Sequence, residues 1–485
     1  MKLKKLAALI AVAGISAPAF ATNGMNMEGY GPVATGMGGA SFAFDNGTAG
    51  MINNPATLGL MQSGTSRFDI AVGGLHPNVD SSVNTPMGTM KAKSDGDAYY
   101  MPAAGYVRKD GRLAWGIGMM AQGGMGTEYG SDSFLSMSQS MMNPTAMPGA
   151  SGQANRTELG IGRLIFPLAF DVSKDFKIGG SLDYLWGGLD LQMVMSGAAF
   201  GQIFAGRSPM ASLNPASTMP AAFGNFMMMP GFDVTWAQFD FSQGGNKMKQ
   251  RLKTDGWAGN IGFQWQATQQ LSIGAVYHAK THLADMSGNG ALKFGVPAGM
   301  TPDGSGVMSV TGKLKVVNFQ WPETYGLGMA YQVNDRLLLA ADYKRIGWAG
   351  VMKNFNMSFT ADSGAMNTGM GLAGTTMILT MPQKWNNQNV FMIGGSYKYS
   401  EALTLRAGVN LADNPIPKKY EFYLFPATIK NHYALGFGYK FSPASSVDFS
   451  YIYAPEVSAT NSLTTGVKTT HAQKHNWQAM YSHRF

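Results

Sequence analysis

Cysteine is absent from this 485-residue chain, and charged residues are scarce. Without Cys, disulfide frameworks and thiolate metal sites are excluded. Charged residues make up 13% of the chain, whereas globular soluble domains usually carry about 25%. Aromatic residues nevertheless reach 11%, and glycine occupies 63 positions. Few charges combined with many aromatic residues are typical of a β-barrel wall that faces lipid.

Long apolar runs are also missing. Residues 1–21 are predicted to be a secretory signal, with a lysine-rich start, a short apolar stretch over 6–15 and an Ala-Phe-Ala cleavage sequence at 19–21. The apolar stretch is too short to span a bilayer as a helix, and no longer one follows. An exported chain of this kind has to enter a membrane as strands.

The last nine residues alternate in character. Trp477, Ala479, Tyr481 and Phe485 fall on one face of an extended strand, while polar residues fall on the other. This pattern predicts a strand that closes a transmembrane barrel by pairing with the first strand. Phe485 is therefore expected to act as the signal recognised by the barrel-assembly machinery.

Segments of period two alternate with turns along most of the chain. Six short polar turns are expected at 109–111, 173–175, 268–270, 334–335, 400–401 and 442–445. Seven longer connections lie near 76–97, 123–155, 193–245, 286–311, 351–384, 414–428 and 457–470. These thirteen connections predict an all-β, fourteen-stranded antiparallel transmembrane β-barrel over residues 65–485, with both ends on the short-turn, periplasmic side.

A barrel of that size has a lumen that would leak unless it were filled. Residues 22–64 are rich in Gly, Ala, Asn and Met without a sustained period. We expect them to form an N-terminal plug, or hatch, inside the lumen. A disordered periplasmic tail is the alternative.

Several short motifs resemble the FadL family of outer-membrane transporters for hydrophobic compounds. The resemblance rests on Glu28-Gly29-Tyr30-Gly31, Met37-Gly38-Gly39-Ala40, Asn53-Asn54-Pro55-Ala56, Arg406-Ala407-Gly408-Val409 and Asp413-Asn414-Pro415-Ile416-Pro417. Gly126 to Ser131 and Asn318-Phe319 to Trp348 look most like the branch linked to monoaromatic hydrocarbons such as toluene. The resemblance implies a fourteen-stranded barrel with a hatch, ligand capture between two long extracellular loops, and lateral exit through a kinked third strand.

Three glycines follow the expected third strand, which runs from about Leu113 to Gln122. Gly123, Gly124 and Gly126 cannot hold a regular ladder well and permit a bulge that separates one strand from its neighbour. A gap of this kind is what a lateral exit needs. The alternative is that these glycines only open the following loop.

The Asn53-Asn54-Pro55-Ala56 motif is predicted to be a turn. Pro55 lacks an N–H, and the Asn53 and Asn54 side chains can hydrogen-bond their own backbone. A gating role and an ordinary turn within the plug remain equally open.

Methionine, with 36 residues, is unusually frequent in the long loops. Met141 and Met142 lie in the second long connection, and Met227, Met228 and Met229 lie beside Phe223 and Phe226 in the third. Flexible thioethers and aromatic rings suit a capture groove for small apolar molecules. The alternative is that methionine is frequent throughout this chain and has no special role in the loops.

Several motifs that could indicate cofactor or metal binding are not supported by the sequence around them. Residues 369–374 match a dinucleotide fingerprint, but they lie in a Gly/Met-rich loop without a strand–helix unit. The pairs His278/His282 and His471/His475 lack a supporting carboxylate pattern for a metal. We therefore expect no enzyme activity, no cofactor and no metal, although sequence alone leaves a barrel-embedded lipid hydrolase open.

The expected function is passive uptake of small hydrophobic molecules across the outer membrane of a Gram-negative bacterium. Monoaromatic hydrocarbons are favoured over long-chain fatty acids, because a carboxylate calls for a paired cation. That preference depends on whether the basic residues of 247–253 face inward. Expected partners are the hydrophobic substrate, outer-membrane lipid and lipopolysaccharide; no nucleic acid is expected, and the protein is predicted to be a monomer. A general diffusion porin and a structural or adhesive barrel are the alternatives.

Overall fold

The computed structural model describes residues 23–241, 252–301, 303–463 and 466–485. The expected secretory signal over 1–21 lies outside the described residues, as do Lys247, Lys249 and Arg251. Lys253, the remaining member of that basic group, is exposed near the start of strand β12. No helix in the described part of the chain is long and apolar enough to cross a membrane.

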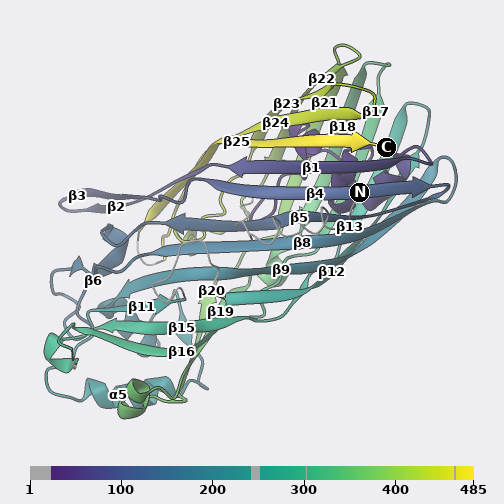
Figure 1. Ribbon diagram of the computed structural model, residues 1–485. Helices are drawn as coiled ribbons and strands as arrows, with labels where there is room; N and C mark the ends of the chain where they lie inside the picture. The colour runs from purple at the N-terminus through teal and green to yellow at the C-terminus, as the bar shows by residue number, and fades with distance from the viewer. Residues whose placement is uncertain (1–22, 242–251, 302, 464–465) are drawn as a thin grey trace.

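A ring of antiparallel strands forms the wall of the molecule (Figure 1). Each strand pairs with the next, and the last pairs with the first, so the ladder closes on itself. In pairing order the strands are β1 (Ser66–Leu75), β4 (Tyr99–Asp110), β5 (Leu113–Glu128), β8 (Arg156–Asp171), β9 (Phe176–Ser196), β12 (Leu252–Gln266), β13 (Leu271–His278), β17 (Thr324–Gln332), β18 (Leu337–Ile346), β21 (Gln388–Lys398), β22 (Leu403–Ala412), β23 (His432–Lys440), β24 (Ser445–Thr460) and β25 (Lys468–Arg484).

Further strands join the same sheet. One row branches from β9 in the order β11 (Trp236–Asp240), β15 (Met286–Gly295), β16 (Val307–Val317), β19 (Asn354–Ala361), β20 (Thr376–Pro382) and β10 (Ser212–Leu213). The β2 (Pro77–Thr85) and β3 (Gly88–Lys93) hairpin extends from β25, and β14 (His282–Leu283) pairs with β12. The two-residue strands β6 (Met137–Ser138) and β7 (Gly149–Ala150) form a separate ladder.

The predicted fourteen-stranded barrel is nevertheless wrong as a description of the wall, because further strands extend the same sheet beyond the ring strands named above. The described residues place 23 strands in one sheet. The error arose because the connections predicted as loops at 193–245, 286–311 and 351–384 contain strands of their own. In β16, for example, buried and less buried residues alternate along the strand. This period of two is typical of a β-strand in the wall and not of a loop.

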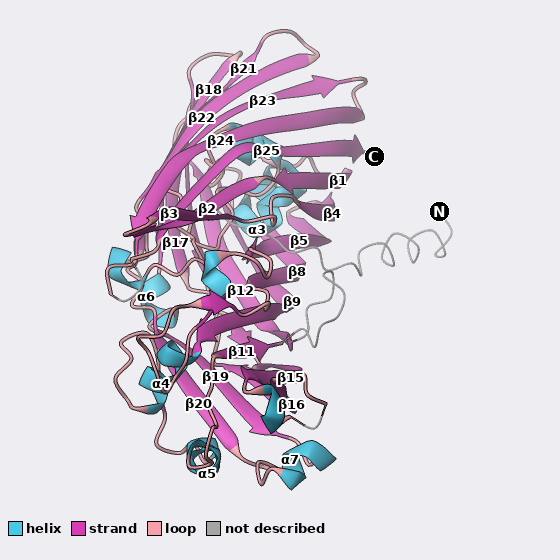
Figure 2. Cartoon of the chain, turned by 90° about the vertical axis from the view of Figure 1, so that its left-hand side faces the viewer, coloured by secondary structure: helices cyan, strands magenta, loops and turns pink. Residues whose placement is uncertain are grey.

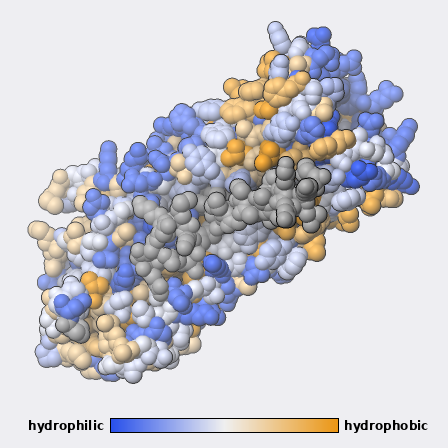
Figure 3. Space-filling model, in the orientation of Figure 1, coloured by the Kyte–Doolittle hydropathy of each residue, from blue (hydrophilic) through white to orange (hydrophobic). Residues whose placement is uncertain are grey.

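The outer face of the ring is apolar. On β17, Tyr325, Leu327, Met329 and Tyr331 alternate with buried residues and are 42–55% exposed. Outward apolar side chains suit hydrocarbon, because ladder pairing within the ring leaves mainly side chains to meet lipid. Figure 3 shows the largest hydrophobic patches over the half of the molecule that carries the ring strands.

The lumen, in contrast, contains buried charged side chains. Buried ion pairs join Arg163 to Asp183 at 2.6 Å and Arg406 to Asp448 at 2.8 Å, each between strands of the ring. A buried charge is tolerated only when it is paired. This part of the inner wall is thus suited to hold polar backbone or water, and not lipid.

The N-terminal segment, defined as residues 23–60, lies inside this lumen. It contains α2 (Pro32–Gly36), η1 (Gly47–Ala49), α3 (Gly50–Asn53) and η2 (Pro55–Leu60). It is almost wholly buried, and its short helices contact β1, β8, β9, β12 and β22 to β25. In Figure 1 this purple segment lies behind β1 and β4.

The remaining helices belong to the long connections. They are η3 (Phe134–Ser136), α4 (Gly197–Phe204), α5 (Met219–Met227), η4 (Ala298–Met300), α6 (Trp348–Val351), α7 (Ala365–Gly369) and η5 (Lys418–Tyr420). Figure 2 shows α4, α5 and α7 near β19 and β20, at the end of the molecule away from the short turns. The long connections therefore gather at one end, as expected for the extracellular side.

The final strand closes the ring as expected. β25 pairs with β1, and the main chain of Phe485 exchanges two hydrogen bonds with Ser66, at 2.9 and 3.2 Å. The Phe485 side chain is 68% exposed and packs edge-on against His483. Its role in assembly stays a prediction.

Candidate functional site

The wall is interrupted between β4 and β5. Their ladder runs only as far as the pair Ala104 and Met119, although β4 begins at Tyr99 and β5 continues to Glu128. On its other side β5 stays paired with β8 throughout, with a register shift between Ala121 and Gly123. We call the stretch between residues 100–103 and 120–127, over which these two strands do not pair with each other, the side opening.

Gly123 forms the bulge at this opening. Its φ of +155° lies in a region that side chains rarely adopt, and a Cβ there would lie 2.1 Å from the Met25 carbonyl oxygen. The bulge predicted from the three glycines is therefore present at Gly123. Gly124 and Gly126 instead pair regularly with Gly160 and Glu158 of β8.

The N-terminal segment covers the side opening from inside. Asn26 forms an isolated β-bridge with Gly123. Asn26 Oδ1 accepts hydrogen bonds from Gln122 Nε2 at 3.1 Å and from Trp321 Nε1. One side chain thus ties the segment to the kinked strand and to the chain after β16.

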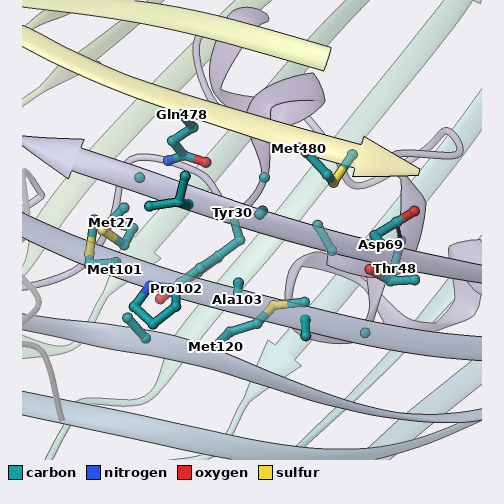
Figure 4. A pocket seen from close by; sticks show the side chains of 18 residues that line it. Met27, Tyr30, Thr48, Asp69, Met101, Pro102, Ala103, Met120, Gln478 and Met480 are labelled. Atoms are coloured by element: carbon teal, nitrogen blue, oxygen red, sulfur yellow. Dashed lines mark hydrogen bonds between the residues drawn. The ribbon is translucent and has the colours of Figure 1, made fainter. Parts of the chain in front are cut away.

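A cavity occupies the side opening (Figure 4). Its volume is about 50 Å³, several times the roughly 10–15 Å³ that one water needs by the same measure. Met27 and Tyr30 of the N-terminal segment form its inner wall, and Met101, Ala103 and Met120 lie at the strands. The lining is mostly apolar, so an apolar molecule would lose little by entering it.

Tyr30 connects the predicted hatch motif to this opening. Its hydroxyl donates to Gln122 O at 2.8 Å, and burial raises the Tyr30 pKa, so the phenol stays protonated. Asn53 holds the Tyr30 main chain, donating from Nδ2 to its carbonyl at 2.9 Å and accepting from its N–H at 3.3 Å. Asn53 is therefore two hydrogen bonds away from the kink.

The other three motif residues anchor the segment elsewhere. Asn54 Nδ2 donates to Phe42 O at 2.7 Å and to Phe263 O of β12 at 3.0 Å, and its Oδ1 accepts from Ala56 N. Pro55 and Ala56 begin η2. The turn reading of this motif is confirmed by the structure, while a gating role stays a prediction.

A second cavity, the lumenal cavity, lies on the other side of the N-terminal segment. Its volume in this state is about 10 Å³, roughly one water. It is lined by Met25, Leu159, Leu191, Met193, Phe319, Met352, Phe355, Met381, Gln383, Trp385, Phe422 and Phe425. Because Met25 lines this cavity and Met27 lines the side opening, residues 25–27 separate the two spaces.

Glu421 lies next to the cavity residue Phe422. Its side chain is buried, and neither carboxyl oxygen has a hydrogen-bond partner among the described residues. Burial raises the Glu421 pKa to about 8, so the carboxyl is mostly neutral at pH 7. Glu421 therefore adds little negative charge near the lumenal cavity.

The predicted loop residues do not line either cavity. Phe223 is fully buried in a cluster of phenylalanines, with its ring 5.0 Å from Phe294. Phe226 packs on Phe223, Met227 is partly buried, and Met228 and Met229 are exposed. A ligand-capture role for this cluster stays a prediction.

The second long connection packs against the same region. Met141 contacts Gly201 of α4, and its N–H bonds to Val234 O at 2.8 Å. Met142 is 60% exposed. The two long connections therefore meet at the extracellular end.

Sequence reasoning missed most of the lumenal cavity. Its residues come from positions between 25 and 425, so no local pattern joins them. The available signal was the aromatic content of 319–321 and of 422–425, the latter within a segment expected to be a loop. Among the described residues, no group of three or more His, Asp or Glu is placed to hold a metal ion.

A closed ring with a filled lumen and an interrupted wall defines a plugged membrane barrel. The family model of the outer membrane protein transport proteins (OMPP1/FadL/TodX) matches residues 7–482. The chain belongs to this family of outer-membrane transport proteins. Its family and solved structural neighbours are transport proteins rather than enzymes.

Solved structures of similar fold include two toluene transporters. TodX of Pseudomonas putida is 27% identical with a TM-score of 0.76, and the match covers 94% of this chain and 99% of TodX. TbuX of Ralstonia pickettii is 27% identical with a TM-score of 0.71 over the same shares. Outer membrane protein P1 of Haemophilus influenzae is 27% identical over 198 residues, which is 41% of this chain. The chain matches 37% of the length of that curated relative.

Because Asn26 bonds the N-terminal segment to the wall, we expect its substitution to destabilise the closed state of the side opening. Asn26→Ala leaves two buried donors, on Gln122 and Trp321, without their acceptor. Even partial loss of these bonds should weaken the closed state by about 2 kcal/mol, raising the open-to-closed ratio about 30-fold. Openings of single proteins in planar bilayers should become correspondingly frequent.

The control for this variant is Asn84→Ala, in the exposed β2–β3 hairpin, where the lost bond is to Thr89 Oγ1. An unchanged opening frequency in a folded Asn26→Ala protein would show that Asn26 does not hold the segment closed.

Proposed function

We propose that this protein carries small hydrophobic compounds passively across the outer membrane and releases them sideways through the side opening. The proposal rests on the interruption of the β4–β5 ladder and on the mostly apolar cavity in the gap. Polar lipopolysaccharide hinders apolar solutes, whereas a path through the wall delivers them to the membrane without a water-filled channel. The driving force is the favourable transfer of apolar surface out of water.

The N-terminal segment serves as the gate in this proposal, with residues 22–64 as hatch and 65–485 as barrel. Residues 25–27 stand between the lumenal cavity and the side opening. Movement of this short stretch would join the two spaces while the rest of the hatch stays anchored. Asn53, through Tyr30, keeps the stretch near Gln122 and Gly123.

Capture takes place at the extracellular end. The long connections bring Met141, Met142, Phe223, Phe226 and the methionines 227–229 to that end of the molecule. Exposed Met228 and Met229 beside buried phenylalanine rings offer an adaptable apolar surface. Ligands then pass inward to the lumenal cavity.

The cargo class is small and uncharged, with monoaromatic compounds ahead of long-chain fatty acids. The described lining of the lumenal cavity contains no Lys, Arg or His, so a buried carboxylate would lack a counter-charge there. TodX and TbuX are named as toluene transporters. Outer-membrane lipid, lipopolysaccharide and the barrel-assembly machinery are the proposed partners of a monomeric protein.

Uptake by a strain that lacks the gene tests this proposal. Labelled toluene uptake should fall to the level of passive permeation and recover when the gene is restored, while labelled oleate uptake changes less. Gene-dependent uptake of oleate alone would reverse the order of cargo. Gene-dependent diffusion of small sugars, with neither apolar compound affected, would favour a porin.

A further inference from the structure

One polar donor in the lumenal cavity lacks an acceptor. Trp321, Trp348 and Trp385 pack edge to face, with neighbouring ring centroids 6.2 and 5.2 Å apart. Trp348 Nε1 donates to Gln388 Oε1 at 3.2 Å, and Trp321 Nε1 donates to Asn26. Trp385 is 3% exposed, and its Nε1 has no hydrogen-bond partner among the described residues. The Trp385 ring is also the one of the three that lines the lumenal cavity.

The position of Trp385 is well determined by its surroundings. Its main-chain N–H bonds to Met352 O at 3.1 Å, and its ring packs on Trp348. Gln383 brings a side-chain amide to the same cavity wall. The other ten lining residues are apolar. Two polar groups, two residues apart in the sequence, therefore line an otherwise apolar space.

Buried donors in folded proteins are nearly always paired, because an unpaired donor forfeits its bond to water. A hydrocarbon that fills the cavity would leave Trp385 Nε1 unpaired. A ligand with one oxygen acceptor would satisfy it, and the apolar walls would hold the rest of that ligand. A carboxylate remains unfavourable, because no Lys, Arg or His is among the described residues that line this cavity.

We propose that the lumenal cavity selects neutral aromatic compounds that carry a single oxygen acceptor, and that Trp385 is the specificity-determining residue that donates to this oxygen. Gln383 provides a second hydrogen-bonding group beside it. This inference rests on the proposed function, since it names the substrate class of the same path. The lumenal cavity would thus bind aromatic ketones, phenols and similar oxygenated aromatic compounds in preference to hydrocarbons of equal size.

Room for such a ring comes from the methionines. Met25, Met193, Met352 and Met381 line the cavity, and their unbranched side chains change rotamer readily. Displacement of Met25 also moves the residues that separate this cavity from the side opening. Ligand entry and release are thereby linked through one side chain.

A pair of isosteric ligands tests the proposal. Acetophenone and α-methylstyrene have the same shape, but the first has a carbonyl oxygen where the second has a methylene. The full-length protein, labelled with ¹⁵N at the indoles of its nine tryptophans, is titrated with each compound and followed by NMR. Acetophenone should shift the Trp385 indole resonance in the direction of a newly formed hydrogen bond, and α-methylstyrene should not.

Two variants complete the test. Trp385→Phe keeps the ring, removes the donor and identifies the resonance; Trp257→Phe, on the exposed face of β12, is the matched control. In cells, gene-dependent uptake, corrected for membrane partitioning, should favour acetophenone about tenfold or more. Trp385→Phe should abolish that preference, and Trp257→Phe should retain it.

Equal uptake and equal resonance shifts for the two compounds would overturn this inference and leave the proposed function standing. The uptake comparison in the wild-type protein decides the point even if Trp385→Phe folds poorly. If neither compound shows gene-dependent uptake, the proposed function fails together with the inference.

Discussion

Deletion of residues 22–64 is expected to convert the closed protein into an open, water-filled pore. The N-terminal segment fills the lumen, and the wall behind it is polar. Asp342 accepts hydrogen bonds from Ser41 N and Phe42 N at 2.6 and 3.0 Å, and Asp69 accepts one from Thr48 N at 2.8 Å. Without the segment these carboxylates would be solvated, and ions would follow the water. Planar-bilayer recordings should change from rare events to a steady conductance typical of porins.

This experiment needs a check on folding, because the segment also stabilises the ring. It bonds to opposite sides of the wall, for example through Asn260 to Met51 O at 3.3 Å and through Thr35 to Ser450 at 2.6 Å. Only heat-modifiable, correctly inserted protein should be recorded. If such protein remains closed, the segment is not the barrier and the gating account is wrong.

The parts of the fold that depend on local pattern were predictable. The six short turns lie between consecutive paired strands, and the bulge was located from three glycines. The number of strands was not predictable in this way. In β15 and β16 the alternation lies within segments flanked by loops, and pairing to β11 and β19, distant in sequence, decides that they are wall.

The site was predictable only in part. Gly123 and Asn53 were identified from their backbone chemistry, and both lie on the path to the side opening. Met25, Asn26 and Trp385 were not, because their significance depends on closure of the ring. Asn26 meets Trp321 across 295 residues of sequence, and no spacing rule reports such a contact.

Closing the side opening with a covalent bridge is expected to abolish transport. Ala103 of β4 and Met120 of β5 both line the cavity in the opening, and they lie one step beyond the last paired residues, Ala104 and Met119. The chain contains no cysteine, so Ala103→Cys with Met120→Cys introduces the only two thiols. A short bis-methanethiosulfonate linker can join them and is removed again by reducing agent.

The matched control bridges the same two strands where they are already hydrogen-bonded. Tyr106 and Ile117 face each other in the β4–β5 ladder, so Tyr106→Cys with Ile117→Cys should tolerate the linker without loss of transport. Comparing transport by the two double-cysteine variants shows whether a loss is due to closure of the side opening or to the linker treatment itself.

Lateral release is the central claim, and gene-dependent uptake of labelled toluene with the linker in place tests it most directly. We expect uptake by the Ala103/Met120 cysteine variant to fall to the level of cells without the protein, and to return after reduction, while the Tyr106/Ile117 cysteine variant is unaffected throughout. Undiminished uptake through a fully bridged opening would contradict the account, because the compound would then have to leave by another route.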